Sequence, residues 1–377
     1  MNVLHLLSNS KWTGPAEPAL NLCVALRRLG VAADFACSPD AGKSINKVAE
    51  TARDRGIEPI LSFSLSKHLN PVSNLLDRAR LARFLRAHPY DLIHCHLDND
   101  HRIAAGAARK LGVPLVRSSY HGSGFPASGA NTRLLAGAGH VFEPSRIAAE
   151  HDTRVHGLEP SRQTIVPGAV DIERFDPARE VPDGRRWLSI PPGAFVVGIV
   201  ARMQTHRHYE DFFEAIRMLA ARRPNVHVIV VGRGTRQEQV GREPVRRLGL
   251  EDRVHFPGYL EGENYVGMLK AFDVKVYLTP GSDGTCRAVR ECMAMRKPAV
   301  VANRGMLREI VNHDLDGIVC DGSGEALFRA LDRLAGDRRL AHGMGMAARE
   351  TAVTHYSLEA QAAAVKAVYE RILAGVR

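Results

Sequence analysis

Residues 274–302, VKVYLTPGSDGTCRAVRECMAMRKPAVVA, contain the pattern on which the predicted fold rests. The apolar run at 274–278 predicts a strand, and a turn with two glycines follows it. The helical spacing of apolar residues at 286–295 predicts a helix, and a second apolar run at 299–302 predicts the next strand. A strand followed by a helix and another strand is the unit of a parallel sheet, so this stretch predicts an α/β fold.

The same alternation extends on both sides of this stretch. A linker rich in proline, glycine and charge, near 177–192, separates two halves of similar length. Such halves form parallel sheets that bind ligands at the C-terminal ends of their strands. The other predicted strands are 3–8, 31–37, 91–96, 114–118, 194–201, 226–232 and 254–256; the other predicted helices are 19–29, 73–87, 102–111, 209–222, 238–248, 262–272, 324–334 and 340–356.

Length and composition are those of a globular protein with more than one domain. The chain has 377 residues, 45% apolar and 24% charged, and six cysteines without a CxxC pair. These values argue against disorder, a disulfide framework and a zinc knuckle. With no long apolar run and no signal-like N-terminus, we expect a cytoplasmic protein. The net charge of +10 favours anionic ligands or an anionic membrane, and no nucleic-acid recognition signature accompanies it.

The start of the helix predicted at 286–295 carries candidate ligand groups. Backbone N–H groups at a helix N-terminus favour an anion such as a phosphate. Asp283 precedes this helix and suits sugar hydroxyls, while Glu291, about two turns inside, suits ribose hydroxyls. The alternative is that Asp283 is an N-cap and Glu291 an ordinary helical carboxylate. The N–H groups facing the anion would be those of Thr285, Cys286 and Arg287.

Four further residues follow predicted strands. Arg202 and Arg207 come after the strand at 194–201, where two guanidiniums can clamp a diphosphate. His121 follows the strand at 114–118 and can bind a hydroxyl or polarise a reacting group. Gly14, in the first turn, allows close approach of backbone to a ligand. The alternatives are a solvated loop, a structural histidine and a plain turn.

A metal site is the weaker interpretation of a third group of polar residues. His94, His96 and Asp98 fall on one face of an extended segment, and Asp98 with Asp100 resembles a DxD motif. The simpler alternative is that Asp98 or Asp100 caps the following helix and that the histidines are structural. We therefore expect no bound metal.

Together these motifs resemble the retaining GT-B glycosyltransferases of family 4. Asp283 and Glu291 match the family's two glutamates separated by seven residues, and Arg202 and Arg207 match its Arg-x4-Lys pair. The resemblance covers nearly the whole chain. Further similar blocks, in the family's order, are DLIHCH (91–96), the His-Gly at 121–122, VPGAVDIERFDP (166–177), VIVVGRG (228–234), RVHFPGY (253–259) and NRGMLREIV (303–311).

The resemblance implies an architecture and an activity. It implies two Rossmann-like, doubly wound domains facing each other across a cleft: 1–178 for the acceptor and 179–357 for the donor. A final helix, about 358–377, would pack back on the first domain. The implied reaction moves a sugar with retention from a UDP- or GDP-sugar to a hydroxyl acceptor such as a cell-envelope or lipid-linked glycan, without an essential metal.

The resemblance also assigns roles to the candidate residues. Arg202 and Arg207 would bind the diphosphate, and Glu291 the ribose. His121 and Asp283 would be catalytic, with His121 approaching the donor from the N-terminal domain. The remaining donor-binding residues would be Gly14, Gly284, Thr285, Cys286 and Arg287.

Three positions depart from the family pattern. Arg207 stands where the family has lysine, Asp283 where it has glutamate, and Arg287 where it usually has an apolar residue. Two other functions stay open at this point. One is a nucleotide-sugar 2-epimerase of the same architecture, and the other is a non-catalytic relative that binds nucleotide sugars.

The helix predicted at 73–87 has the pattern of an interfacial helix. Its leucines, among them Leu75, Leu76, Leu81 and Leu85, fall broadly on one side. Arg78, Arg80, Arg83 and Arg86 flank them. The alternative is a surface helix that packs its leucines on the sheet. The hypothesis is weak, salt-sensitive association with the anionic inner face of a membrane.

Overall fold

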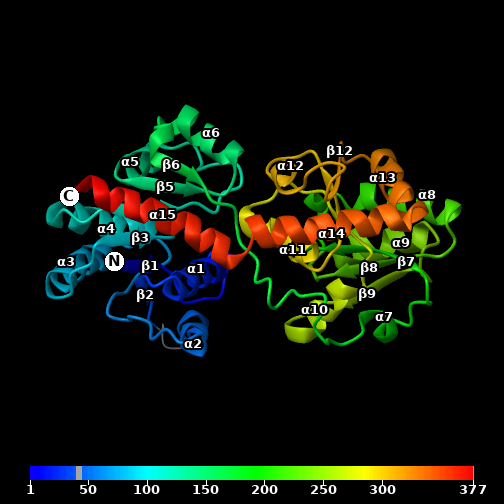
Figure 1. Cartoon of the computed structure of the whole chain (residues 1–377), viewed down its shortest axis with the longest axis horizontal. Helices are drawn as coiled ribbons and strands as arrows, with labels where there is room; N and C mark the ends of the chain where they lie inside the picture. Colours follow the sequence, from blue (N-terminus) through cyan, green and yellow to red (C-terminus); the bar gives the residue numbers. More distant parts are fainter. Residues whose placement is uncertain (40–44, 377) are drawn as a thin grey trace. The chain divides into compact units, whose positions relative to one another are not determined.

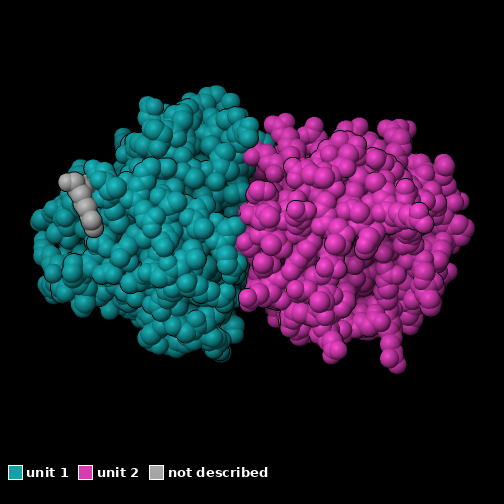
Figure 2. All heavy atoms as spheres, in the orientation of Figure 1, with its two compact units in different colours: residues 1–169, 282–284, 358–377 teal, residues 170–281, 285–357 magenta. Residues whose placement is uncertain are grey.

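The computed structural model describes residues 1–39 and 45–376, which form two compact units. The first unit comprises Met1–Ala169, Ser282–Gly284 and Leu358–Arg377, and the second Val170–Gly281 and Thr285–Ser357 (Figure 2). The sequence predicted the change of domain after residue 178 and the return after residue 357. No helix in the described ranges is both long enough and apolar enough to cross a bilayer.

The first unit is built on a six-stranded parallel sheet in the order β2-β1-β3-β4-β5-β6 (Figure 1). Its strands are β1 (Asn2–Leu7), β2 (Ala32–Cys37), β3 (Leu92–Cys95), β4 (Leu115–Ser118), β5 (His140–Glu143) and β6 (Gln163–Ile165). Its helices are α1 (Ala16–Arg28), α2 (Lys47–Asp54), α3 (Pro71–Ala87), α4 (Asp98–Leu111), α5 (Gly129–Ala136), α6 (Arg146–His156), η1 (Pro160–Arg162) and α15 (Leu358–Val376).

The second unit repeats this plan with the strand order β12-β11-β10-β7-β8-β9. Its strands are β7 (Phe195–Val200), β8 (Val226–Val231), β9 (Val254–Gly258), β10 (Val274–Tyr277), β11 (Ala299–Ala302) and β12 (Gly317–Cys320). Its helices are α7 (Gly184–Trp187), η2 (Thr205–Arg207), α8 (Tyr209–Arg222), η3 (Glu238–Arg242), α9 (Glu243–Arg247), α10 (Gly262–Ala271), α11 (Asp283–Ala294), α12 (Leu307–Ile310), α13 (Gly324–Gly336) and α14 (Arg338–His355).

Each sheet has an apolar core on both faces because helices cover both. Alternate residues of β1 show this: Val3 and Leu7 belong to one buried cluster, Leu4 and Leu6 to the other. The cluster of Val3 and Leu7 includes buried side chains of α1 and of the C-terminal helix α15. Burial on both faces explains why the strands read as short continuous apolar runs.

The structure corrects several predicted bounds. Helix α4 begins at Asp98 rather than at 102, and α11 at Asp283 rather than at 286. The helix predicted at 238–248 is a π-helical turn, η3, followed by α9. Pro244 explains the change, because it lacks the N–H that would donate to the carbonyl four residues earlier. Residues 119–162, to which the sequence pattern assigned no element, hold α5, β5, α6 and η1.

Candidate functional site

The turn between β10 and α11 has a geometry that requires glycine. Gly281 has a φ of +58°, and a Cβ at this position would lie 2.1 Å from Thr285 Oγ1. The chain can therefore turn tightly from the end of the strand into the first turn of the helix. Thr285 and Cys286 lie in that first turn, where the positive end of the helix dipole favours an anion.

Arg207 is linked to this helix through a tyrosine of β10. Its Nη1 donates to Tyr277 Oη at 2.8 Å, and Tyr277 also hydrogen-bonds with Thr285. Burial is the main cause that raises the pKa of Tyr277, so the phenol stays neutral. Of the predicted pair, Arg207 is half-buried in η2, whereas Arg202 is exposed on the loop after β7. This network connects Arg207 to the start of α11.

The loop that carries Arg202 is braced by two glycines of VIVVGRG. A Cβ at Gly232 would lie 2.3 Å from the carbonyl oxygen of Ala201, and a Cβ at Gly234 2.2 Å from that of Met203. Only glycine permits this approach of two backbones. The motif therefore shapes the segment on which Arg202 stands.

Glu291 is buried and held by two neighbours. Its side chain is 5% exposed, Tyr265 Oη donates to Oε2 at 2.5 Å, and Arg287 Nε lies 3.2 Å from Oε1. Burial and then the Glu291 charge raise the pKa of Tyr265 well above its usual value, so this phenol stays a donor. Arg287, which departs from the family pattern, is thus the ion-pair partner of the predicted ribose ligand.

Asp283 is the first residue of α11 rather than a residue before it, and its side chain is 4% exposed. The backbone N–H of Gly168, in the family-like segment 166–177, donates to its Oδ1 at 3.2 Å. Asp283 and Gly284 group with the first unit, as do Gly14 and His121. Gly14 is exposed two residues before α1 begins. The remaining six predicted site residues lie in the second unit.

His121 stands on a loop that follows β4. The residue is exposed, its ring centroid lies 5.1 Å from that of Phe125, and its backbone N–H donates to Ser119 Oγ at 3.4 Å. The pKa of His121 is lowered, first by desolvation and then by the Arg117 guanidinium. A neutral imidazole at this point can accept or donate a hydrogen bond at physiological pH.

Asp98 and Asp100 have structural partners. Arg117 Nη2 donates to Asp98 Oδ1 at 2.8 Å. Asp100 accepts the backbone N–H of Leu97 at 3.0 Å, the capping contact at the start of α4, and that of Ser8 at 2.9 Å. The capping alternative is therefore confirmed for Asp100, and Asp98 is held by Arg117, so a metal site at this pair stays the weaker interpretation.

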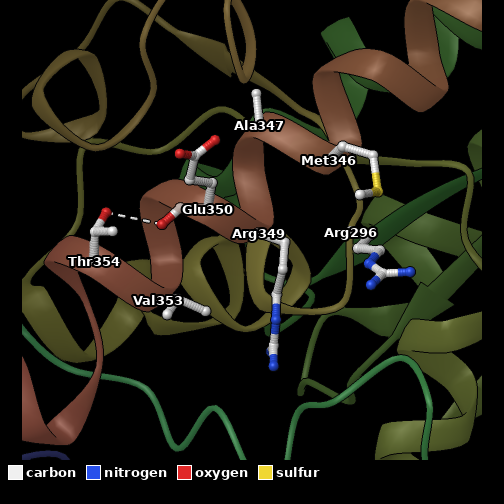
Figure 3. Close-up of a pocket in the computed structure, with 7 residues that line it drawn as sticks. All are labelled: Arg296, Met346, Ala347, Arg349, Glu350, Val353 and Thr354. Atoms are coloured by element: carbon white, nitrogen blue, oxygen red, sulfur yellow. Dashed lines mark hydrogen bonds between the residues drawn. The ribbon is translucent and has the colours of Figure 1, made fainter.

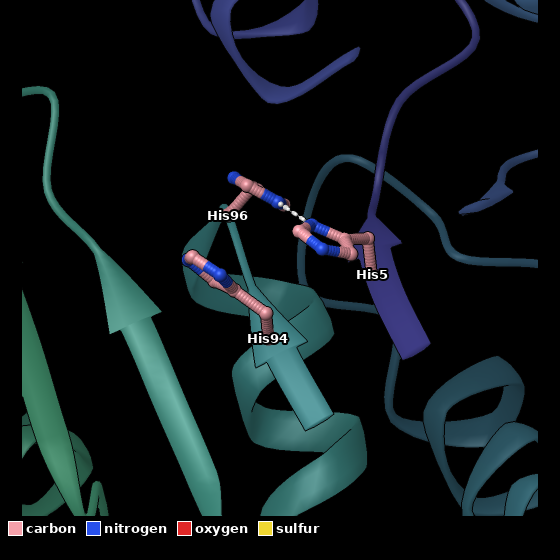
Figure 4. Close-up of side chains that lie close together, drawn as sticks. All are labelled: His5, His94 and His96. Carbon is pink, nitrogen blue, oxygen red and sulfur yellow. Dashed lines mark hydrogen bonds between the residues drawn. The ribbon is translucent and has the colours of Figure 1, made fainter. Parts of the chain in front are cut away.

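His94 and His96 meet a third histidine, His5, which the sequence analysis missed (Figure 4). All three are fully buried, and His5 Nδ1 lies 3.0 Å from His96 Nε2. The rings stack, with centroids 4.4–5.3 Å apart and interplanar angles of 12–30°. Ring nitrogens of the three lie within 4.8 Å of one another. Both ring nitrogens of His94 contact hydroxyl groups, those of Tyr369 and Ser118, and His96 Nδ1 lies 2.7 Å from Tyr120 Oη. These partners fit a hydrogen-bonded stack better than a metal centre.

An open cavity of about 370 Å³ lies along α14, apart from the predicted residues (Figure 3). Arg349, one of its lining residues, donates to the backbone carbonyls of Phe175 and Ala294 and so fastens α14 to its neighbours. This role is structural. The lining residues are Arg296, Met346, Ala347, Arg349, Glu350, Val353 and Thr354.

Sequence analysis also missed Tyr265, Tyr277 and Lys275 beside the predicted donor residues. Lys275 is fully buried in β10, and its Nζ has no hydrogen-bond partner among the described residues. Burial lowers its pKa to about 8. A signal was present, because a lysine inside the otherwise apolar strand VKVY is unusual. The tyrosines gave none.

Comparison with known proteins gives two matching families. The model described as "Glycosyltransferase Family 4" matches residues 13–174, and the model "Glycosyl transferases group 1" matches residues 183–351. A D-inositol 3-phosphate glycosyltransferase of Salinispora arenicola is 27% identical over 70% of this chain, and the match spans only 65% of the relative's length. An Escherichia coli UDP-Gal:alpha-D-GlcNAc-diphosphoundecaprenol alpha-1,3-galactosyltransferase is 23% identical over 76% of this chain and 77% of that protein.

A solved structure supports the same fold. Alr3699/HepE of Anabaena, in complex with UDP and glucose, has a TM-score of 0.75 at 19% identity and covers 98% of this chain and 99% of that one. With the two parallel sheets described above, this likeness identifies the GT-B fold. The two family models together cover most of the chain. The chain belongs to the family 4, group 1 glycosyltransferases.

Proposed function

We propose that the protein is a retaining glycosyltransferase that moves a sugar from a nucleotide-diphosphate sugar to a hydroxyl acceptor. The observation that carries the proposal is the connection of Arg207, Tyr277 and Thr285 at the start of α11, with the held carboxylate of Glu291 in the same helix. A cation beside a helix N-terminus suits a diphosphate, and a fixed carboxylate suits two ribose hydroxyls. The family supports a donor of this class, and we favour UDP over GDP as its nucleotide because the Escherichia coli relative is named for a UDP-Gal donor.

In the proposed reaction, Arg202 and Arg207 neutralise the charge that develops on the leaving diphosphate. The backbone of residues 284–287 binds phosphate and sugar, and Asp283 binds sugar hydroxyls. His121, neutral at physiological pH, donates to or accepts from the sugar at the reacting face, and Gly14 allows backbone to approach the donor. We propose that no metal is needed, since two guanidiniums and a helix N-terminus supply the positive charge.

The acceptor is proposed to be a lipid-linked or cell-envelope glycan bound by residues 1–178, with the donor bound by 179–357. The name of the Escherichia coli relative, which acts on a diphosphoundecaprenol-linked sugar, supports this class. A lipid-linked acceptor places the enzyme at a membrane surface.

Helix α3 is the proposed membrane contact, but its exposed apolar residues differ from those that the sequence predicted. The predicted leucines do not lie together: Leu81 and Leu85 are buried, whereas Leu75 and Leu76 are 66% and 52% exposed. Leu69 and Val72 are exposed beside them. These four residues, here called the α3 patch, stand next to the exposed arginines 78, 80, 83 and 86. An exposed apolar patch flanked by arginines suits an anionic interface.

The proposed diphosphate clamp is tested by Arg207→Ala, with Arg207→Lys as the matched control. Loss of one charge-assisted contact to the leaving group removes on the order of 2–4 kcal/mol of transition-state stabilisation, so we expect kcat/KM to fall at least thirty-fold in Arg207→Ala. Arg207→Lys keeps the charge and should retain more activity. The assay follows released nucleotide and the anomeric configuration of the product by NMR. Wild-type rates in Arg207→Ala contradict the clamp.

The same assay separates the proposal from the two alternatives. A transferase releases free nucleotide only with an acceptor that gains the sugar. An epimerase changes the donor sugar without any acceptor, and a binding protein gives neither product although nucleotide binds. The NMR spectrum of the donor therefore decides among the three functions.

A further inference from the structure

Two buried carboxyl groups lie beneath the loop that carries His121. Glu143 ends β5 and Asp152 lies in α6, and both are 0% exposed. Asp152 Oδ1 accepts the backbone N–H of Phe125 at 2.8 Å and lies 2.9 Å from His151 Nδ1. Among the described residues, neither Asp152 Oδ2 nor either oxygen of Glu143 has a donor at hydrogen-bonding geometry. Three carboxyl oxygens are thus buried close together, and the Ser119 hydroxyl is the O–H group beside Glu143 that interacts with its carboxyl.

We propose that Glu143 and Asp152 form a buried carboxyl pair that holds one proton between them and positions the His121 loop. The proposal rests on the proposed role of His121 at the donor. One proton turns Glu143 into an O–H donor to Asp152, which satisfies oxygens that would otherwise be unpaired anions. Burial first, and then the charge and hydrogen bond of Asp152, raise the pKa of Glu143 well above its usual value.

The other charged and polar groups around the pair leave this proton in place. The Ser119 hydroxyl and Arg117 oppose the rise in the pKa of Glu143, but less strongly than burial and Asp152 raise it. The Arg117 guanidinium donates to Asp98 and lies 4.0 Å from Asp100, so its charge is committed to those carboxylates. From α6, His151 contacts Asp152, and His156 Nε2 lies 3.2 Å from the carbonyl oxygen of Phe125.

The loop is seated directly on this pair. Gly124 has a φ of +90°, and a Cβ there would lie 2.4 Å from His151 Nδ1 and 2.6 Å from Asp152 Oδ1. At the residue directly after His121, Ser145 Oγ donates to the carbonyl of Gly122 at 3.1 Å. The loop that follows His121 is therefore anchored at Gly122 and again at Gly124–Phe125, and the second anchor depends on Asp152.

The pair gives the His121 loop a dependence on pH. When the shared proton is lost at alkaline pH, two buried carboxylates repel each other, and Asp152 no longer holds Phe125 in place. The orientation of His121 then changes, so turnover falls on the alkaline side. Asp152 and Glu143 are positioning residues, because neither touches the substrate in the proposed reaction.

The test uses the full-length protein and the variant Glu143→Gln. The amide donates a hydrogen bond to Asp152 without a titratable proton, so we expect the alkaline fall in kcat to move upward by at least one pH unit. Glu150→Gln, at an exposed glutamate of α6, the helix of Asp152, is the matched control and should keep the wild-type profile. In wild type, difference infrared spectra at pH 8 should contain the band of one protonated carboxyl group that is absent in Glu143→Gln.

A second readout does not need activity. NMR of the His121 imidazole should report, besides its own titration, an alkaline inflection that is present in wild type and absent in Glu143→Gln. If Glu143→Gln does not fold, Asp152→Asn removes the same titration and keeps an acceptor for Phe125. An inactive protein that still shows this inflection overturns the proposed function and leaves the pair intact. No protonated carboxyl band at pH 8, or an unchanged inflection in the variant, overturns the pair.

Discussion

At the scale of single residues, Lys275 destabilises the folded protein. Its ammonium is buried with no hydrogen-bond partner in the described part of the chain, and its nearest aromatic contact is the Tyr277 ring, 5.5 Å from Nζ to the centroid. A buried charge without a partner is unfavourable, which is why the pKa of Lys275 falls to about 8. Lys275 thus lies beside Tyr277, whose hydroxyl accepts a hydrogen bond from the proposed donor-binding residue Arg207.

Replacing Lys275 by methionine should therefore stabilise the protein. From a pKa lowered from 10.5 to about 8, we expect a gain of about 3 kcal/mol in the free energy of unfolding at pH 7. Between pH 8 and 10.5 the unfolded state binds more protons than the folded state, so wild-type stability rises with pH and the difference shrinks. Chemical denaturation of Lys275→Met and wild type measures this difference in the free energy of unfolding, with Lys110→Met, at an exposed lysine, as the control. A less stable Lys275→Met contradicts the account.

The histidine stack should make the fold sensitive to acid. Burial lowers the pKa of His5 to about 3, and the pKa values of His94 and His96 fall well below 6.5. The stack is then neutral when folded, while the unfolded chain takes up protons below pH 6.5. The stability it contributes is complete above pH 6.5 and is lost as pH falls toward 3, by about 1.4 kcal/mol per pH unit for each histidine.

The variant His5→Phe tests this dependence. Phenylalanine can stack but cannot titrate, so the slope of unfolding free energy between pH 6 and 4.5 should become shallower by the share of one histidine. The exposed His342→Phe serves as the control with an unchanged slope. An equal slope in wild type and His5→Phe is the outcome that disproves a neutral buried His5.

At the scale of elements, α3 shows how one helix divides its apolar residues. Asp77, fully buried, accepts the backbone N–H groups of Ser64 and Leu65 at 2.9 and 2.8 Å, and Leu81 and Leu85 are buried with it. This fixes the rotation of the helix. The α3 patch and the four arginines are consequently left exposed.

The membrane proposal predicts that Leu75→Ser/Leu76→Ser weakens association with anionic vesicles. Serine at these two positions has less apolar surface to bury in the membrane interface than leucine. Each arginine near an anionic surface contributes about 1 kcal/mol, so neutralising arginines 78, 80, 83 and 86 should weaken association further. Co-sedimentation with phosphatidylglycerol vesicles at low and high salt provides the measurement. The exposed Leu315→Ser, in the second unit, is the control. Equal pelleting of all variants excludes α3 as the contact.

At the scale of the whole molecule, each unit has its own parallel sheet and its own cores. The chain leaves the first unit after residue 169, contributes Ser282–Gly284 to it, and returns finally with α15. The buried face of α15, with Val365, Val368 and Tyr369, completes the core against α1. The first unit therefore depends on both ends of the chain.

Nucleotide binding should stabilise the whole chain without a divalent metal. We expect UDP to raise the melting temperature, since a ligand at 100 times its Kd adds about 2.7 kcal/mol to the stability of the state that binds it. The shift should be the same in EDTA and in Mg²⁺ or Mn²⁺, and smaller in Arg202→Ala. A thermal-shift screen of UDP, GDP and ADP, with and without EDTA, checks this. A shift that appears only with added metal contradicts metal independence.

The sequence by itself determined the elements whose signals are local. The bounds of α8 and β11 match the predicted 209–222 and 299–302, because an amphipathic period or a short apolar run needs no information from elsewhere in the chain. The strand HVFE at 140–143 was not predicted, because His140 and Glu143 break the apolar run although both are buried. The ordered motifs were sufficient to indicate the family.

Only the tertiary structure decided which distant residues meet. His5 and His94 pair in register across β1 and β3, and His94 Nδ1 contacts Tyr369 Oη, 275 positions along the chain. Neighbouring strands in a parallel sheet are joined by long crossovers, and their register follows from how the helices pack on the faces. Periodicity in the sequence carries no record of that packing. The histidine stack, the Glu143–Asp152 pair and the tyrosines beside Arg207 and Glu291 therefore became visible only in the folded chain.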